Sequence, residues 1–258
     1  MGVVNVTPDS FSDGGRLRTP QAAIGHALNL REQGADILDI GGESTRPGAS
    51  PVEPDAEWRR IAPVLEALVA ADVPVSVDTR KPSVMQAAIA AGAAMINDVE
   101  ALRAPGAVEI VARGGVAVCL MHMQGQPRTM QEQPAYGDVV TEVTAFLSGR
   151  VDACEQAGIG RDRIAVDPGF GFGKTLEHNL ALLRHLDSLL QLRVAILVGL
   201  SRKSMLGSLT GRPIDQREYA GVAANLLALA RGASIVRVHD VAAMRDALSV
   251  WNAVEGEH

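Results

Sequence analysis

Polar side chains stand at the ends of short apolar runs along the sequence, and their types suit a polar, anionic ligand. Asp78, Asn97 and Asp167 each end or follow such a run. An ionised carboxylate only accepts hydrogen bonds, whereas an amide both donates and accepts, so these residues could bind a ligand that carries donors and acceptors. Lys203 and Arg237 follow later runs. Because a cation at the start of a helix opposes the helix dipole, Lys203 indicates an anion nearby.

The elements that must position these residues alternate between short and long. Short runs rich in β-branched residues predict strands, and the longer amphipathic segments between them predict helices. The predicted strands cover residues 2–6, 36–40, 73–77, 94–98, 116–121, 164–166, 195–199 and 235–238. The predicted helices include residues 20–33, 55–70, 82–91, 138–157 and 178–189. No linker or shift in composition divides the chain, so we predict one α/β domain over residues 1–258.

Eight strand–helix units are the number that a (β/α)8 TIM barrel needs, although a doubly wound open sheet could also hold them. The polar strand ends favour the barrel. In a barrel the carboxyl ends of all eight strands meet at one mouth, where active sites lie. In an open sheet, strand ends far from the switch point would stay apart.

Composition and charge exclude several classes of protein. The formal net charge of −6 argues against a general nucleic-acid binder, which usually has a basic face. No apolar run is long enough to span a bilayer, and the N-terminus lacks the pattern of a signal peptide. Cys119 and Cys154 have no metal-ligand spacing, so we expect reduced thiols in a cytoplasmic protein.

Long motifs, in order along the whole chain, resemble those of the dihydropteroate synthases. The matching stretches are residues 5–15, 41–48, 76–79, 96–98, 120–125, 167–174, 199–204 and 237–240. The resemblance implies a transferase of folate biosynthesis on a pterin-binding TIM barrel. Members of this family usually carry an N-terminal hairpin over the barrel floor. The sequence lacks the residues for it, so we expect this hairpin to be missing.

The resemblance implies a reaction and its substrates. The family joins (7,8-dihydropterin-6-yl)methyl diphosphate to 4-aminobenzoate, which gives 7,8-dihydropteroate and diphosphate, with Mg²⁺ as cofactor. It also implies a homodimer and inhibition by sulfonamides, which mimic 4-aminobenzoate. The residues that match the pterin-binding positions are Asp78, Asn97, Asp167, Lys203 and Arg237.

The resemblance also assigns the other two subsites. The residues that match the diphosphate site are Asn5, Arg46, Arg237 and His239, where Asn5 offers the neutral oxygen that suits Mg²⁺. His239 lies two residues after Arg237, which places both on one face of a strand. The residues that match the 4-aminobenzoate pocket are Thr45, Arg46, Pro47, Phe172, Lys203 and Ser204, and Phe11 and Ser12 match a lid over it.

The implied chemistry is a dissociative displacement in which Asp78, Asp167 and Lys203 are the catalytic residues. Diphosphate leaves first, and ionised Asp78 or Asp167 stabilises the pterin carbocation. The amine of 4-aminobenzoate is already a neutral nucleophile, so no strong general base is required. Two alternatives stay open: a pterin-binding methyltransferase, which needs no diphosphate or 4-aminobenzoate site, and a non-catalytic pterin-binding paralogue.

Several features receive a structural interpretation. The run from Gly171 to Thr175 lacks the first glycine of a phosphate-binding loop, because Pro168 occupies that position. No second histidine has metal-ligand spacing to His122, which we interpret as structural or as a support for other site residues. The acidic residues of 52–57 are expected to form a solvated turn and helix start. Glu100 departs from the family pattern without a functional interpretation.

Overall fold

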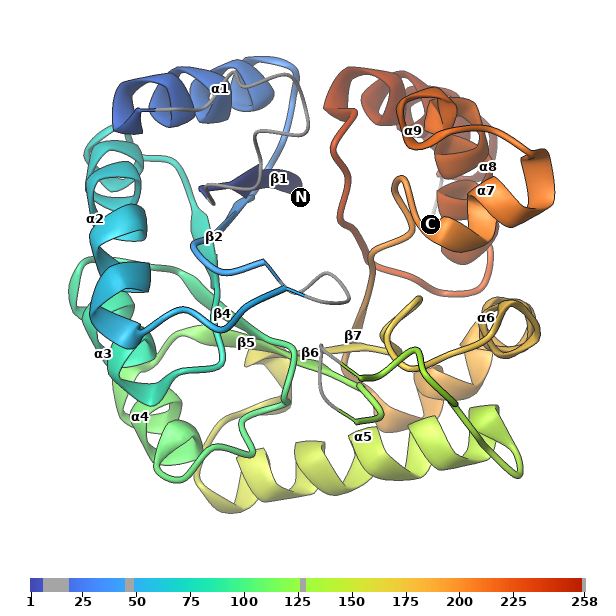
Figure 1. The fold of residues 1–258 in the computed structure, drawn as a ribbon, viewed down its shortest axis with the longest axis horizontal. Coiled ribbons are helices and arrows are strands. Elements are labelled where there is room, and N and C mark those ends of the chain that lie inside the picture. The colour runs from blue at the N-terminus through green and yellow to red at the C-terminus, as the bar shows by residue number, and fades with distance from the viewer. Residues whose placement is uncertain (7–18, 45–48, 126–128, 257–258) are drawn as a thin grey trace.

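The computed structural model describes residues 1–6, 19–44, 49–125 and 129–256. Eight parallel strands follow one another in chain order, and helices form a ring around them (Figure 1). The strands are β1 (Gly2–Asn5), β2 (Leu38–Gly41), β3 (Val75–Asp78), β4 (Met95–Asp98), β5 (Ala117–Met121), β6 (Ile164–Asp167), β7 (Ala195–Val198) and β8 (Ile235–Val236). The helices are α1 (Pro20–Glu32), α2 (Pro54–Ala70), α3 (Pro82–Ala90), α4 (Ala107–Gly114), α5 (Val139–Gln156), α6 (Leu176–Arg184), α7 (Ser204–Thr210), α8 (Glu218–Leu229) and α9 (Val241–Glu255).

The last strand returns to the first. Gly2 forms a parallel bridge with Val238, and the Val3 N–H donates to the Val238 carbonyl over 3.0 Å. The prediction of an α/β fold with eight parallel strands is therefore confirmed, and the arrangement is TIM-barrel-like. Several predicted bounds were wrong by about two residues, since β2 begins at Leu38 and β8 ends at Val236.

A small apolar cluster fills the space between the strands and decides which residues face the mouth. Its buried members are Met1, Met95, Cys119, Ala165 and Leu197, with Ile37, Ala117, Ala195 and Ile235 packed against them. Side chains alternate between the two faces of a strand, so a residue two positions after a cluster member points the same way, one layer closer to the carboxyl end. This spacing relates Ile37 to Asp39, Met95 to Asn97, Ala165 to Asp167, and Ile235 to Arg237.

The outer face of the strands packs against the helices in the main core. Val4, Ile40, Val77, Ile96 and Val166 are all fully buried and belong to this core. They alternate with the residues that face the barrel interior, so both faces of these strands are buried. The helices thus hold the strands in register, and the register places the polar residues at one end.

Candidate active site

One guanidinium joins two carboxylates at the mouth. The Arg237 Nε donates to Asp39 Oδ2 over 2.6 Å, and its Nη2 donates to Asp78 Oδ2 over 3.3 Å. The amide of Asn97 donates to the same Asp39 oxygen over 3.2 Å. The middle of β2, the carboxyl-terminal parts of β3 and β4 and the residue after β8 therefore contribute to one polar cluster, which includes the predicted residues Asp78, Asn97 and Arg237.

Asp39 is a site residue that the sequence analysis missed. It lies in the middle of β2, is fully buried, and leaves its Oδ1 without a hydrogen-bond partner among the described residues. A buried carboxylate is costly unless it is paired. An aspartate flanked by apolar residues within a buried strand, as in Leu38-Asp39-Ile40, was the available signal that a cation must lie nearby.

The electrostatics of the pair bear on the protonation of Asp78. Burial and the neighbouring Asp39 carboxylate together raise the pKa of Asp78 to about 8, against the opposing effect of Arg237. The raised pKa increases the protonated fraction of Asp78 at neutral pH compared with an ordinary aspartate. A protonated carboxyl can donate a hydrogen bond as well as accept one.

A second group of predicted residues gathers at the ends of β6 and β7. Asp167 Oδ1 accepts a hydrogen bond from the Gly169 N–H over 2.7 Å, and burial raises the pKa of this carboxyl against the effect of that bond. The Lys203 Nζ lies 4.2 Å from the centre of the Phe172 ring, a cation–π contact. Burial lowers the pKa of Lys203 to about 8, and Asp167 opposes the shift.

The remaining described residues of the predicted site occupy the rim. Asn5 ends β1 and is half-buried, and Ser204 begins α7 and is exposed. The backbone N–H of His239 donates to Ser201 Oγ over 3.2 Å, and its Nδ1 lies 3.1 Å from the same oxygen. Because β8 ends at Val236, contacts such as these, and not strand alternation, position His239. The predicted residues Phe11, Ser12, Thr45, Arg46 and Pro47 lie outside the described residues.

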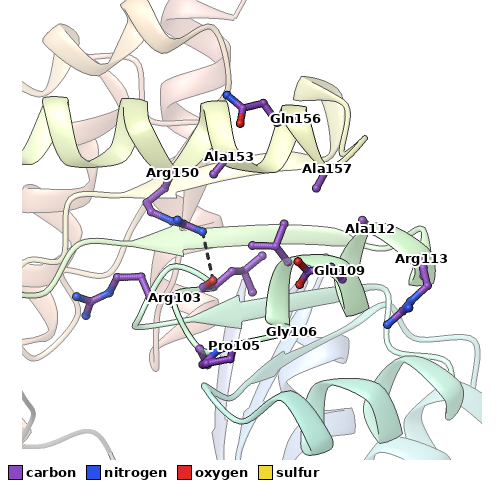
Figure 2. A pocket seen from close by; sticks show the side chains of 13 residues that line it. Arg103, Pro105, Gly106, Glu109, Ala112, Arg113, Arg150, Ala153, Gln156 and Ala157 are labelled. Carbon is purple, nitrogen blue, oxygen red and sulfur yellow. Dashed lines mark hydrogen bonds between the residues drawn. The ribbon is translucent and has the colours of Figure 1, made fainter.

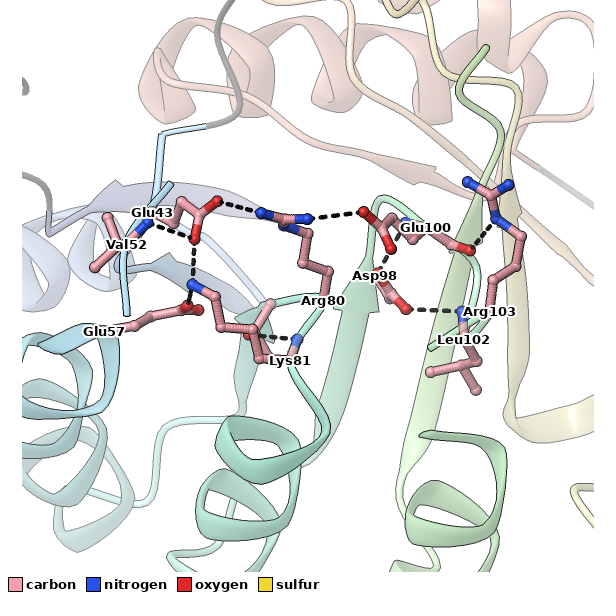
Figure 3. A network of polar contacts seen from close by, with 10 residues as sticks. Glu43, Val52, Glu57, Arg80, Lys81, Asp98, Glu100, Leu102 and Arg103 are labelled. Carbon is pink, nitrogen blue, oxygen red and sulfur yellow. Dashed lines mark hydrogen bonds and ion pairs between the residues drawn. The ribbon is translucent and has the colours of Figure 1, made fainter. Parts of the chain in front are cut away.

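Beside the mouth, five charged residues form a connected network, which we call the rim network (Figure 3). Its members are Glu43, Glu57, Arg80, Lys81 and Glu100. Arg80 bridges Glu43 and Glu100 over 3.1 and 3.0 Å, and Lys81 contacts the carboxylates of both Glu43 and Glu57.

The rim network shows that the interpretation of Glu57 was wrong and gives Glu100 a structural role. The side chain of Glu57 is only 1% exposed, so this acidic residue is not part of a solvated helix start, as the sequence analysis expected. Glu100, which departs from the family pattern, is a partner of Arg80. Glu43 also accepts a hydrogen bond from the Val52 N–H over 3.3 Å, so the network joins both ends of the connection from β2 to α2.

A hollow of about 770 Å³ lies elsewhere, between α4 and α5 on the outside of the barrel (Figure 2). Arg150, which lines it, donates to the carbonyls of Ala101 and Leu102 over 2.8 and 3.2 Å. None of the strand-end residues lines this hollow. The convergence of charged groups at the mouth, and not this hollow, therefore marks the candidate active site.

Two searches of the described residues bear on metals and membranes. In the described ranges, no group of three or more histidine, cysteine, aspartate or glutamate side chains could hold a metal ion. Across the same ranges, no helix combines the length and the apolar character that a membrane span requires.

Comparison with known proteins identifies the family of the chain. The family described as pterin binding enzyme matches residues 1–239. A dihydropteroate synthase of Neisseria meningitidis serogroup C is 53% identical, over 98% of this chain and 92% of the relative. The structure of Xanthomonas albilineans dihydropteroate synthase with 4-aminobenzoic acid has a TM-score of 0.93 and 57% identity, and it covers 100% of this chain and 93% of that one.

A further structure contains a drug. Yersinia pestis dihydropteroate synthase in a sulfonamide drug complex has a TM-score of 0.95 and 47% identity, over 99% of this chain and 94% of that one. Identities of this size over nearly the full chain extend the likeness from the fold to the sequence. The chain therefore belongs to the pterin binding enzyme family and, within it, to the dihydropteroate synthases.

Proposed function

We propose that the chain condenses (7,8-dihydropterin-6-yl)methyl diphosphate with 4-aminobenzoate, giving 7,8-dihydropteroate and diphosphate. The observation that carries the proposal is the charged cluster at the mouth, in which Arg237 lies between Asp39 and Asp78 with Asn97 beside them. This cluster offers donors and acceptors together, as the edge of a pterin requires. In this proposal the whole cluster belongs to a single domain that spans residues 1–258.

The pterin is assigned to Asp78, Asn97, Asp167, Lys203 and Arg237. Asp78 and Arg237 share a hydrogen bond. The charges of Asp167 and Lys203 are close enough to shift each other's pKa values. These contacts support one pocket formed from both groups of residues. Asp39 contributes by accepting hydrogen bonds from Arg237 and Asn97, which fix the positions of these two side chains.

The diphosphate is assigned to Asn5, Arg46, Arg237 and His239, with Mg²⁺ as its counter-ion. Mg²⁺ commonly keeps several waters and shares oxygen ligands with substrate phosphates, so it does not require a cage of protein carboxylates. The absence of such a cage among the described residues and the amide oxygen of Asn5 at the mouth both fit this mode. When bound, the ion neutralises part of the charge of the leaving diphosphate.

The 4-aminobenzoate is assigned to Thr45, Arg46, Pro47, Phe172, Lys203 and Ser204, with Phe11 and Ser12 as a lid. Within the described part of the chain, the contact between Lys203 and the Phe172 ring supports this assignment. The ring offers a face to an aromatic substrate, and the ammonium offers a charge to a carboxylate. Sulfonamides, which resemble this substrate, should bind in the same place.

The proposed mechanism is dissociative. Arg46, Arg237 and His239 stabilise the leaving diphosphate, which takes both electrons of the C–O bond. The remaining pterin carbocation lies beside Asp78 and Asp167. Because the pKa of Asp78 is about 8, positive charge developing on the pterin favours its ionised form. The neutral amine then attacks the carbocation and releases one proton.

Two further proposals concern the protein as a whole. Large apolar residues are exposed on α8 and α9, namely Tyr219, Leu227, Val250 and Val254, which supports a homodimer formed through these helices.

Cys119 and Cys154 are both buried and unpaired, which supports a cytoplasmic protein with reduced thiols.

The first test is diphosphate release by the purified protein with Mg²⁺, the dihydropterin diphosphate and 4-aminobenzoate, each omitted in turn. Formation of dihydropteroate that depends on both substrates is expected. Asp78→Ala and Asp167→Ala should lose activity and remain folded, whereas the exposed Asp36→Ala should behave as the wild type. Turnover near the wild-type rate in both active-site variants would refute the assignment.

A further inference from the structure

A buried lysine that the mechanism does not use lies behind the mouth. The Lys174 Nζ is within 3.0 Å of three acceptors, namely His122 Nδ1 and the carbonyl oxygens of Gly169 and Phe172. The residue is 3% exposed. Two of these acceptors belong to the loop between β6 and α6, which runs from Pro168 to Thr175. The charge of this lysine is therefore enclosed by the loop that carries Phe172.

The loop between β6 and α6 has the geometry of a binding site for the Lys174 ammonium. Gly169, Gly171 and Gly173 all have positive φ, at 71°, 80° and 62°. Glycine adopts this region readily, and the tight turns it allows bring successive peptide groups to one side. A phosphate-binding loop turns its N–H groups inward onto an anion. Here carbonyl oxygens surround a cation, so the polarity is reversed.

The protonation state of His122 fits this geometry. Burial lowers the pKa of His122 to about 3, so its ring is neutral and Nδ1 can accept a hydrogen bond when the proton is on Nε2. An ammonium has three N–H donors for the three acceptors at 3.0 Å, and the His122 carbonyl oxygen lies further away, at 3.4 Å. A neutral amine has only two N–H donors and no charge, so it would hold the carbonyl oxygens of the loop less strongly.

The structure assigns to Lys174 the role of a positioning residue for 4-aminobenzoate: its ammonium fixes the loop between β6 and α6 and thereby holds the Phe172 ring against Lys203. This inference rests on the proposed role of Phe172. The Lys174 Nζ holds the Phe172 carbonyl, and the Phe172 ring contacts the Lys203 Nζ. Space for this contact comes from Gly171, where a Cβ would lie 3.3 Å from the Lys203 Cδ.

Asp167 should depend on Lys174 much less than Phe172 does. Asp167 is the last residue of β6, and its carbonyl accepts a hydrogen bond from the His122 N–H over 2.9 Å. The sheet therefore holds Asp167, whereas Phe172 lies five residues further along the loop. Loss of the ammonium should impair 4-aminobenzoate binding and spare the pterin.

The first experiment measures both KM values for Lys174→Met, with Phe172→Ala as reference. We expect the KM for 4-aminobenzoate to rise on the order of tenfold, less than the roughly 100-fold that a misplacement of about 1 Å can cost, and the KM for the pterin diphosphate to stay within about twofold. Thr175→Ala is the matched control, because it removes the α6 cap at the neighbouring residue and leaves the contacts of Lys174 in place. It should lower Tm without changing either KM.

The outcomes separate the inference from the proposed function. If Phe172→Ala raises the KM for 4-aminobenzoate and a folded Lys174→Met does not, the role of Lys174 is overturned alone. Equal rises of both KM values in Lys174→Met also overturn it, because they indicate a general structural effect. If Phe172→Ala changes neither KM, the assignment of Phe172 fails, and the inference fails with it.

The second experiment uses the wild type, so it does not depend on the folding of a variant. The chain has only three lysines, Lys81, Lys174 and Lys203, so protein labelled with ¹³C at lysine Cε gives few signals to titrate by NMR. Burial lowers the pKa of Lys174 to about 7, Asp167 opposes the shift, and Lys203 adds to it. His122, with a pKa of about 3, stays neutral. The KM for 4-aminobenzoate should rise with the deprotonation of Lys174, before Lys203 loses its proton near pH 8. A KM that stays constant through the Lys174 titration, or that follows only the titration of Lys203, would overturn the inference.

Discussion

The rim network gives a prediction whose size follows from burial. Replacement of Lys81 by methionine removes the cation that contacts Glu43 and Glu57. The Glu57 Oε1 has no partner among the described residues, and its Oε2 contacts Lys81. At 1% exposure, water cannot replace that contact. Removal of one partner from a buried ion pair typically costs about 3–5 kcal/mol.

The cost converts into a shift of the melting temperature. For a protein of this size, 1 kcal/mol corresponds to roughly 2–4 °C, so Lys81→Met should lower Tm by roughly 6–20 °C at neutral pH. Differential scanning calorimetry or circular dichroism measures this shift. The double variant Lys81→Met with Glu57→Gln removes the unpaired charge and should recover much of the loss. Arg113→Met, at an exposed position on α4, is the control and should change Tm little.

The pH dependence gives a second check of the same prediction. Burial alone would raise the pKa of Glu43, but Lys81 and Arg80 together lower it below its usual value. A carboxyl with a lowered pKa stabilises the fold above its unfolded-state pKa, and this contribution is lost as the pH falls through the folded-state value. The difference in Tm between the wild type and Lys81→Met should therefore shrink in acid. A shift below about 2 °C at neutral pH, or no recovery in the double variant, would refute the reasoning.

Three further predictions concern the mouth. The plot of kcat/KM against pH should rise as Asp78 ionises near pH 8 and fall as Lys203 loses its proton near the same value. In Asp39→Asn the rising limb should move to lower pH, because Asp39 raises the pKa of Asp78. A rising limb that does not move would exclude this coupling. Gly169→Ala should lower the free energy of unfolding in urea far more than Gly158→Ala. Both glycines have positive φ, but a Cβ at Gly169 would lie 1.9 Å from the His122 carbonyl oxygen, whereas a Cβ at Gly158 would have no heavy atom within 4 Å. Equal losses of stability in the two variants would contradict this packing. Removal of Mg²⁺ with a chelator should stop diphosphate release and leave Tm nearly unchanged, whereas a large fall in Tm would indicate a structural metal.

The sequence predicted the strand ends well because the rule behind them is local. A buried parallel strand is apolar in nearly every position, so the first polar residue after it marks its carboxyl end. Asp78, Asn97 and Asp167 were found in this way, and each ends or lies near the end of its strand in the structure. The starts of β2 and β3 were set two residues too early, because the apolar residues Ile37 and Val73 precede these strands.

Residues whose role depends on a distant partner were not predictable. Asp39 pairs with Arg237 across 198 positions of the chain, and Glu57 meets Lys81 from another strand–helix unit. Lys174 follows a glycine-rich run, where a lysine in sequence suggests either solvent or a phosphate. Only the turns at three glycines direct carbonyl groups toward it, and the backbone angles of those turns are not readable from residue types.

The small number and the placement of the lysines have a practical consequence for anyone who handles the protein. The only side-chain amines of the sequence are those of Lys81, Lys174 and Lys203. Lys81 belongs to the rim network, Lys174 lies behind the mouth, and Lys203 lies within the mouth. Reagents that couple through lysine, such as activated esters or aldehydes, would find few accessible amines on this surface. Any side-chain amine that did react would belong to the functional region. Attachment to a solid support should therefore use an added cysteine or a terminal tag.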